Sequence, residues 1–143
     1  MKQVKSKDGT TIQYQSWGDG AQTVIFVHGW MASSAIFDRV LAELPKLDVR
    51  ILALDLRGAG GSDEAKTGYD IDRYVEDVEA VIAASGAEKV TLVGHSMGGQ
   101  IAQVTAARNS DRRGVRPPPS TPPVAASTLK GVAVASRSTP TKN

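Results

Sequence analysis

The sequence predicts an α/β protein over residues 1–111, in which helices cover a mostly parallel sheet. Three short apolar runs indicate this class, at residues 24–27, 51–54 and 90–93, and each is nearly continuous rather than alternating. Continuous apolar runs are typical of strands that are covered on both faces. Helical patterns follow each run, so the expected order is ββ-βα-βα-βα.

The first expected elements are two short strands at residues 2–6 and 11–16, on either side of Asp8-Gly9, a frequent turn pair. After the run 24–27, the possible caps Ser33 and Ser34 precede a helix that Pro45 discourages from continuing. The apolar stripe of this helix consists of Ile36, Phe37, Val40, Leu41 and Leu44.

A second helix is expected between the runs 51–54 and 90–93. Asp70 is its expected N-cap and Gly86 its C-terminal stop. Its apolar stripe consists of Ile71, Tyr74, Val75, Val78, Val81 and Ile82. A third helix, with a weaker face, follows the last run and carries Met97, Ile101, Val104, Thr105 and Arg108.

Residues 112–143 differ in composition from the preceding domain. They hold six of the seven prolines, eight serines or threonines, six basic residues and no acidic residue, whereas residues 1–111 hold 11 basic and 15 acidic residues. The net charge of +2 therefore describes neither part, and we infer no nucleic-acid partner from it. We expect a core at 1–111 and a disordered basic tail at 112–143.

Several classes of site and location are not expected. The chain has no cysteine, which excludes disulfides, thiolate metal sites and a cysteine nucleophile. Its first ten residues lack the apolar region of a secretory signal, and no apolar run approaches the ~20 residues that a membrane span needs. We expect a cytoplasmic protein with no membrane contact, no metal and no cofactor.

The stretch Gly94-His95-Ser96-Met97-Gly98 fits the pattern G-x-S-x-G, between an apolar run and a helical pattern. A serine on a sharp strand-to-helix turn projects its hydroxyl into open space, and the flanking glycines remove side chains that would collide. The alternative is that Ser96 only caps a helix.

A second stretch, from Phe26 to Met31, also follows an apolar run. The backbone N–H groups of Trp30 and Met97 could stabilise a carbonyl oxygen as it becomes negative. The Trp30 side chain could instead, or also, line the substrate pocket. We expect His28 and the neighbour of the serine, His95, to be structural.

The third stretch is the glycine-rich loop after the run 51–54, which reads ALDLRGAGGSD. Arg57 and Asp63 could hold it by ionic hydrogen bonds. A dinucleotide-binding loop is not favoured, because Asp63 replaces the third glycine of G-x-G-x-x-G and no helix follows directly.

Together FVHGW, DLRGAGGSD and LVGHSMGG resemble the α/β-hydrolase family in motif, order and spacing, over roughly residues 10–111, with Ala59 where many members carry a histidine. The resemblance is to the single-domain esterase and cofactor-free haloperoxidase-like members, and it covers the N-terminal half of the fold only. It implies Ser96 as nucleophile, with Trp30 and Met97 as backbone oxyanion donors.

The general base of such a site is missing. The triad of this fold runs Ser, Asp or Glu, then His along the chain, yet no histidine follows Ser96 and the only later acid is Asp111. We therefore expect a weakly active or inactive form, truncated by fragmentation or by a frameshift near Arg112. Translating the encoding DNA in the other two frames tests this hypothesis.

An interrupted sheet would leave the strand 90–93 as an exposed edge that promotes association, while the oligomeric state itself stays open. The expected function is hydrolysis of a small ester or related acyl substrate through an acyl-enzyme; ester, lactone, thioester, peracid and amide chemistry all remain open. The alternative is a non-catalytic binding protein that keeps the hydrolase cleft and docks its PPPSTPP stretch as polyproline II.

Overall fold

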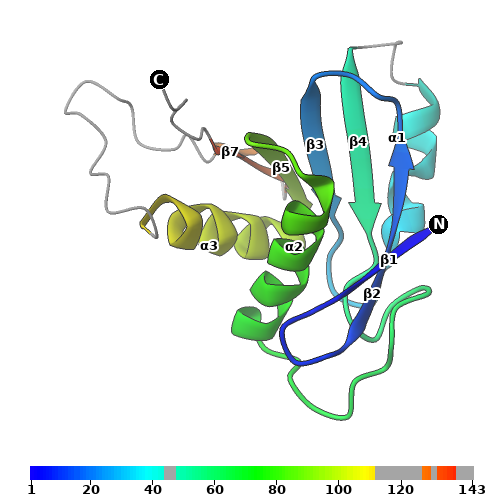
Figure 1. The fold of residues 1–143 in the computed structure, drawn as a ribbon, viewed down its shortest axis with the longest axis vertical. Helices are drawn as coiled ribbons and strands as arrows, with labels where there is room; N and C mark the ends of the chain where they lie inside the picture. Colours follow the sequence, from blue (N-terminus) through cyan, green and yellow to red (C-terminus); the bar gives the residue numbers. More distant parts are fainter. Residues whose placement is uncertain (44–47, 112–126, 130–131, 138–143) are drawn as a thin grey trace.

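The computed structural model describes residues 1–43, 48–111, 127–129 and 132–137. The strands form one sheet in the order β1-β2-β4-β3-β5-β7-β6. Figure 1 labels all of these strands except β6. The central strands β4 (Val49–Leu54), β3 (Gln22–Val27) and β5 (Val90–His95) run parallel, as their apolar runs predict. The predicted hairpin, β1 (Lys2–Lys5) and β2 (Thr11–Trp17), joins β4 antiparallel.

Side chains of the central strands alternate between two apolar clusters, one on each face of the sheet. Ile25 and Val27 contribute to the larger cluster, with residues of α2 (Ile71–Ser85) and α3 (Met97–Asp111). The smaller cluster joins Phe26 and Ala53 of the sheet to Phe37, whose ring meets the Phe26 ring edge-on at 5.0 Å. The sheet is therefore covered on both faces, as the α/β prediction requires.

The ends of α2 follow the predicted local signals. Asp70 is its N-cap and accepts a hydrogen bond from the Arg73 N–H at 2.9 Å. Gly86 ends the helix with φ 66°, a left-handed conformation that suits glycine.

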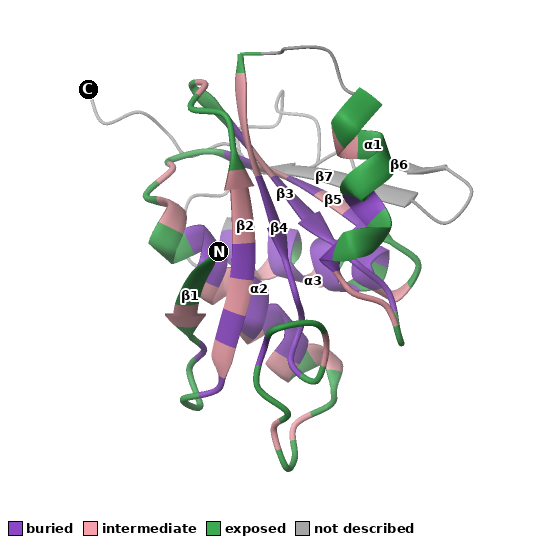
Figure 2. Ribbon diagram, turned by 90° about the vertical axis from the view of Figure 1, so that its right-hand side faces the viewer, coloured by how far each residue is buried: buried purple, intermediate pink, exposed green. Residues whose placement is uncertain are grey.

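The helix predicted after Ser33 differs from its expectation. A 3₁₀ turn, η1 (Ser34–Phe37), comes first and leads into the short helix α1 (Asp38–Glu43), so Leu44 and Pro45 lie outside the described residues. Among the described residues of the predicted stripe, Phe37 is the only buried one, whereas Ile36 and Val40 are 43% and 51% exposed. Most of α1 is exposed (Figure 2), because few of its side chains pack against the sheet.

Two strands fall inside the segment predicted to be a disordered tail. β7 (Val132–Arg137) pairs antiparallel with β5, and β6 (Ser127–Leu129) pairs with β7. The prediction of disorder is thus corrected at these residues, and β5 is not the exposed edge that was expected. An apolar strand offers an unpaired row of N–H and C=O groups, and Val-Ala-Val is a sequence that can pair with it. The rest of residues 112–143 lies outside the described residues.

Candidate active site

Ser96 occupies the bend between β5 and α3. Its φ is 55°, a left-handed conformation that residues with side chains rarely adopt, and the residue is exposed. The Gly99 N–H donates to the Ser96 carbonyl oxygen at 2.9 Å, which closes the first turn of the helix. A helix-capping serine has an extended backbone, so this φ argues against the alternative that Ser96 only caps α3.

The glycines around Ser96 allow backbone segments to approach closely. A Cβ atom at Gly94 would lie 2.2 Å from the carbonyl oxygen of Gly98, and one at Gly98 would lie 2.1 Å from that of Val27. The bend, the first turn of α3 and the end of β3 are therefore packed backbone against backbone. This is the physical requirement behind the glycines of G-x-S-x-G.

The loop after β3 reaches the same place. β3 and β5 are parallel neighbours, with Val27 opposite Gly94, so their carboxyl ends lie together. A Cβ atom at Gly29 would sit 3.0 Å from Ser96 Cβ and 3.6 Å from its Oγ. Trp30 and Met31 follow, 74% and 86% exposed, and Met31 has φ 54°. The structure thus brings together the two stretches that the sequence singles out.

His28 is buried beneath this loop and uses both ring nitrogens. Nε2 accepts the Leu56 N–H at 3.0 Å, so Nδ1 carries the proton that reaches the Gly29 carbonyl oxygen at 2.7 Å. Burial lowers the pKa of His28 below its usual value. The imidazole is therefore a neutral support of the loop, consistent with the structural role predicted for it.

Asp55, directly after β4, is a site residue that the sequence reasoning missed. The residue is 4% exposed, and its carboxylate accepts two backbone hydrogen bonds, from Ser34 N at 2.8 Å and Gly61 N at 3.0 Å. An acidic residue at the carboxyl end of a buried strand was the available signal. Its partners lie 21 and 6 residues away, so only the fold reveals them.

Arg57 holds the glycine-rich loop to two other segments. It makes two hydrogen bonds to Asp77 of α2, from Nε at 2.9 Å and from Nη2 at 2.7 Å, and both side chains are fully buried. Nη1 also bonds Asp8 in the hairpin turn at 2.8 Å. Asp77 raises the pKa of Arg57, and hydrogen bonds from Arg57 and Thr10 hold the pKa of Asp8 well below its usual value.

Asp63 also contributes to holding this loop, as predicted. Its Oδ2 accepts the Thr11 N–H at 2.8 Å, and hydrogen bonds from Thr11 lower the pKa of the carboxyl. Residues 64–70 separate the loop from α2, so no helix opens directly from the glycines.

Comparisons with known proteins show the family of this chain. A family model described as the alpha/beta hydrolase fold matches residues 22–114. The non-heme haloperoxidase of Rhodococcus erythropolis is 40% identical over 113 residues, which are 78% of this chain and 41% of that protein. The chain belongs to the α/β-hydrolase family.

Solved structures of the family superpose on this chain. The esterase of Exiguobacterium antarcticum has a TM-score of 0.70 at 36% identity, over 74% of this chain and 39% of that one. The bottromycin epimerase BotH, solved in complex with bottromycin A2, has a TM-score of 0.69 at 42% identity, over 74% of this chain and 43% of that one. The chain spans about two fifths of the length of the relatives it matches.

The general base of an α/β-hydrolase has no counterpart among the described residues. Within that part of the chain no side chain hydrogen-bonds the Ser96 hydroxyl, and the nitrogens of His28 are occupied. His95 is exposed at the end of β5, and its predicted structural role stays a prediction. Asp111 ends α3, about 20 Å along the helix axis from Met97 at 1.5 Å per residue, too far to orient a base at Ser96.

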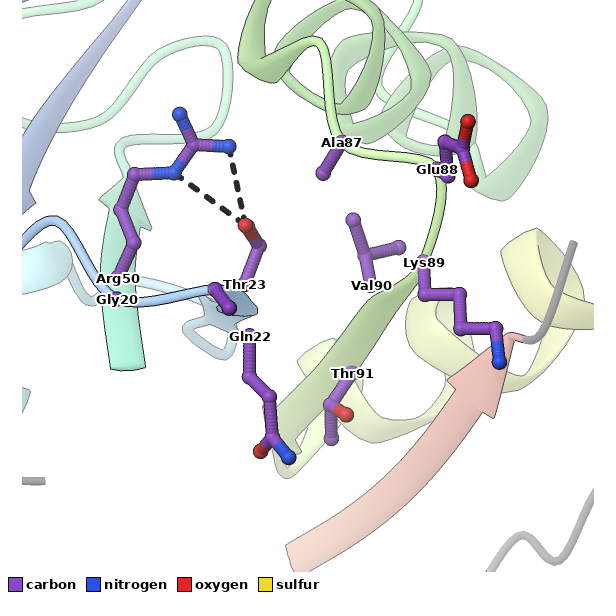
Figure 3. A pocket seen from close by; sticks show the side chains of 10 residues that line it. Gly20, Gln22, Thr23, Arg50, Ala87, Glu88, Lys89, Val90 and Thr91 are labelled. Atoms are coloured by element: carbon purple, nitrogen blue, oxygen red, sulfur yellow. Dashed lines mark hydrogen bonds between the residues drawn. The ribbon is translucent and has the colours of Figure 1, made fainter. Parts of the chain in front are cut away.

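A cleft of about 680 Å³ lies at the opposite end of the sheet (Figure 3). Its polar wall includes Arg50, which donates to Thr23 Oγ1 from Nη2 at 3.0 Å and to the Ser85 carbonyl oxygen at 2.8 Å. Val90, which lines this cleft, is five residues from His95 along β5, or about 16 Å at 3.3 Å per residue. The cleft is therefore separate from the bend at Ser96.

Two features are absent from the described ranges. In residues 1–43, 48–111, 127–129 and 132–137, no helix is long and apolar enough to cross a membrane. The same residues contain no group of three or more His, Cys, Asp or Glu side chains arranged to hold a metal ion.

Proposed function

We propose that this member of the α/β-hydrolase family is a serine hydrolase in which Ser96 attacks the carbonyl carbon of a small ester or related acyl substrate. One observation carries the proposal: an exposed serine hydroxyl stands on a left-handed bend between β5 and α3, beside the Gly29 loop. The proteins similar to this chain include esterases, and this similarity supports an acyl substrate for the proposed reaction.

In the proposed reaction, Ser96 Oγ bonds to the acyl carbon, and the carbonyl electron pair moves onto the oxygen. The backbone N–H groups of Trp30 and Met97 hydrogen-bond this oxyanion, aided by the partial positive charge at the start of α3. The alcohol then leaves with a proton, and water hydrolyses the acyl-enzyme. We propose that the Trp30 ring contacts the apolar part of the substrate, because this residue is 74% exposed and directly follows Gly29.

The hydroxyl proton has water as its acceptor in the chain as it stands, because no histidine follows Ser96. Serine hydrolases that lose triad members retain ~10³–10⁴-fold acceleration over water from the oxyanion hole and binding. We therefore propose slow acylation rather than efficient turnover.

The alternative is a binding protein that keeps the same cleft without ester chemistry. The similarity to a bottromycin epimerase supports this alternative, because that relative is named for epimerisation and not for ester hydrolysis. Under this alternative the folded chain binds an acyl compound at the bend but does not react with it.

Labelling with a fluorophosphonate distinguishes the two. The serine hydrolase predicts one phosphonylated peptide containing residue 96, none in Ser96→Ala, and unchanged labelling in Ser16→Ala, a control on β2. A matching slow release of p-nitrophenol from p-nitrophenyl acetate is expected. A folded wild-type chain that stays unlabelled, or labelling that persists in Ser96→Ala, would reject Ser96 as nucleophile.

A further inference from the structure

We propose that Asp55 is a positioning residue for the loop 29–34, whose Gly29 lies against Ser96 and whose Trp30 N–H is the proposed oxyanion donor. The inference rests on the proposed function, because it assigns a role in the same site. It concerns a carboxylate that does not touch substrate and acts through the loop.

The loop is held at both ends by the segment after β4. At its start, His28 links the Gly29 carbonyl oxygen to Leu56 N, at 2.7 and 3.0 Å. At its end, Asp55 Oδ1 accepts the Ser34 N–H at 2.8 Å. Both supports come from consecutive residues of one segment, so the loop is placed relative to β4 and not only relative to its own strand.

Asp55 is itself fixed in place. Its Oδ2 accepts the Gly61 N–H at 3.0 Å, its N–H donates to the Gln13 carbonyl oxygen at 2.9 Å, and its own carbonyl oxygen accepts the Ser62 hydroxyl at 2.5 Å. Gly60 approaches so closely that a Cβ atom there would lie 2.2 Å from Oδ2. The carboxylate therefore has little freedom to shift, as a positioning group requires.

The middle of the loop has little other support from packing. Trp30 and Met31 are 74% and 86% exposed, and Met31 holds a strained φ of 54°. A strained backbone persists only where the surrounding structure determines it. We infer that the two end supports, rather than burial, keep the Trp30 N–H in place.

An oxyanion donor contributes only when it lies at hydrogen-bond distance from the developing charge, so a small displacement reduces the rate strongly. In Asp55→Asn the amide oxygen still accepts one of the two N–H groups. The amide NH₂ group is itself a donor, so it cannot accept the other N–H. Asp63→Asn is the matched control, because Asp63 on the same loop also accepts a backbone N–H, from Thr11 at 2.8 Å. That contact fixes the hairpin and not the loop 29–34.

A second variant removes the donor instead of the acceptor. Ser34 is the first residue of η1, a position that tolerates proline. Ser33 before it has φ −145° and ψ 176°, the extended backbone that a residue preceding proline adopts. Ser34→Pro therefore deletes the N–H that Asp55 accepts while leaving the Asp55 to Gly61 bond in place.

The test is amide hydrogen exchange measured by peptide mass spectrometry, together with the rate of fluorophosphonate labelling of Ser96, on the full chain. Since the lost bond is charge-assisted, we expect Asp55→Asn to speed exchange in residues 29–35 by about tenfold or more and to slow labelling by a similar factor. Ser34→Pro should do the same in residues 29–33. Asp63→Asn should speed exchange only around Thr11 and leave the labelling rate unchanged.

Exchange that rises equally across the chain in Asp55→Asn would show a general structural role and overturn the proposal. Unchanged labelling of Asp55→Asn, with a labelled wild type, would overturn it as well. A wild type that is not labelled, combined with faster exchange confined to residues 29–35 in Asp55→Asn, would reject the proposed nucleophile and still support Asp55 as the residue that positions the loop.

Discussion

Replacing Arg57 with methionine should destabilise the protein more than replacing an exposed charged residue does. Arg57 and Asp77 form a two-bond ion pair whose side chains are both 0% exposed. Methionine fills much of the space but leaves the Asp77 carboxylate buried without its cation. Removing one partner of a buried pair costs about 3–5 kcal/mol, so Arg57→Met is expected to lose this amount of unfolding free energy.

Two further variants separate the buried charge from general loss of packing. Arg57→Met/Asp77→Leu removes both charges and should recover at least half of the loss, since apolar replacements of buried pairs are often neutral. Arg73→Met breaks an ion pair with Glu76 whose arginine is 40% exposed, and it should lower the unfolding free energy far less than Arg57→Met does.

Urea unfolding followed by circular dichroism measures these differences. Domains of this size have about 5–15 kcal/mol of stability, so the Arg57→Met loss is a large fraction of the total and the midpoint should fall clearly. A loss below about 1 kcal/mol in Arg57→Met would refute the reasoning. So would a double variant that is less stable than the single one.

Three other outcomes follow from the same structure. Gly98→Ala should cost about 1–3 kcal/mol or more in thermal unfolding, because its Cβ meets the Val27 carbonyl oxygen at 2.1 Å; Gly86→Ala, where nothing lies within 4 Å, should cost only the ~1–2 kcal/mol of its left-handed φ. Stability should fall as the pH drops below about 6.5, because the unfolded chain binds a proton that buried His28, with its lowered pKa, does not; His28→Gln should flatten that slope in pH-dependent unfolding. Ser96→Gly should be more stable than Ser96→Ala by about 1 kcal/mol, because glycine relieves the strain of the left-handed φ; equal melting temperatures of the two variants would contradict a strained bend.

Local signals in the sequence predicted much of the fold. Asp70 and Gly86 mark the ends of α2 because capping acts within a few residues, and the three apolar runs became the parallel strands. The G-x-S-x-G bend was predictable in part for the same reason, since Gly94 faces Gly98 within one turn, whereas Gly98 faces the distant carbonyl oxygen of Val27 in β3.

Partners distant in the sequence were not predictable. The sequence alone indicates an exposed position for Asp77 on α2. Asp77 nevertheless lies three residues after buried Tyr74 and four before buried Val81, on the same helix face. An acid on an apolar stripe was a usable signal for a buried cation. The identity of that cation, Arg57, depends on packing across 20 residues of sequence.

β7 was missed for a different reason. The composition of residues 112–143 is typical of disorder, and composition averages over the short Val-Ala-Val stretch that pairs with β5. The strand became favourable only because β5 presents a free edge, which is a property of the sheet and not of the stretch itself.

Residues with a left-handed backbone fall into two groups, six glycines and two residues that carry a side chain. Wherever the described chain turns with a positive φ for structural reasons it uses glycine, at positions 9, 18, 58, 60, 68 and 86. Among the described residues only Met31 and Ser96 keep a side chain at such a φ, and each does so at an energetic disadvantage of about 1–2 kcal/mol. Both follow the carboxyl ends of neighbouring strands, β3 and β5. Folding alone would favour glycine at both, so the two side chains support the proposal that this corner of the sheet binds and attacks a substrate.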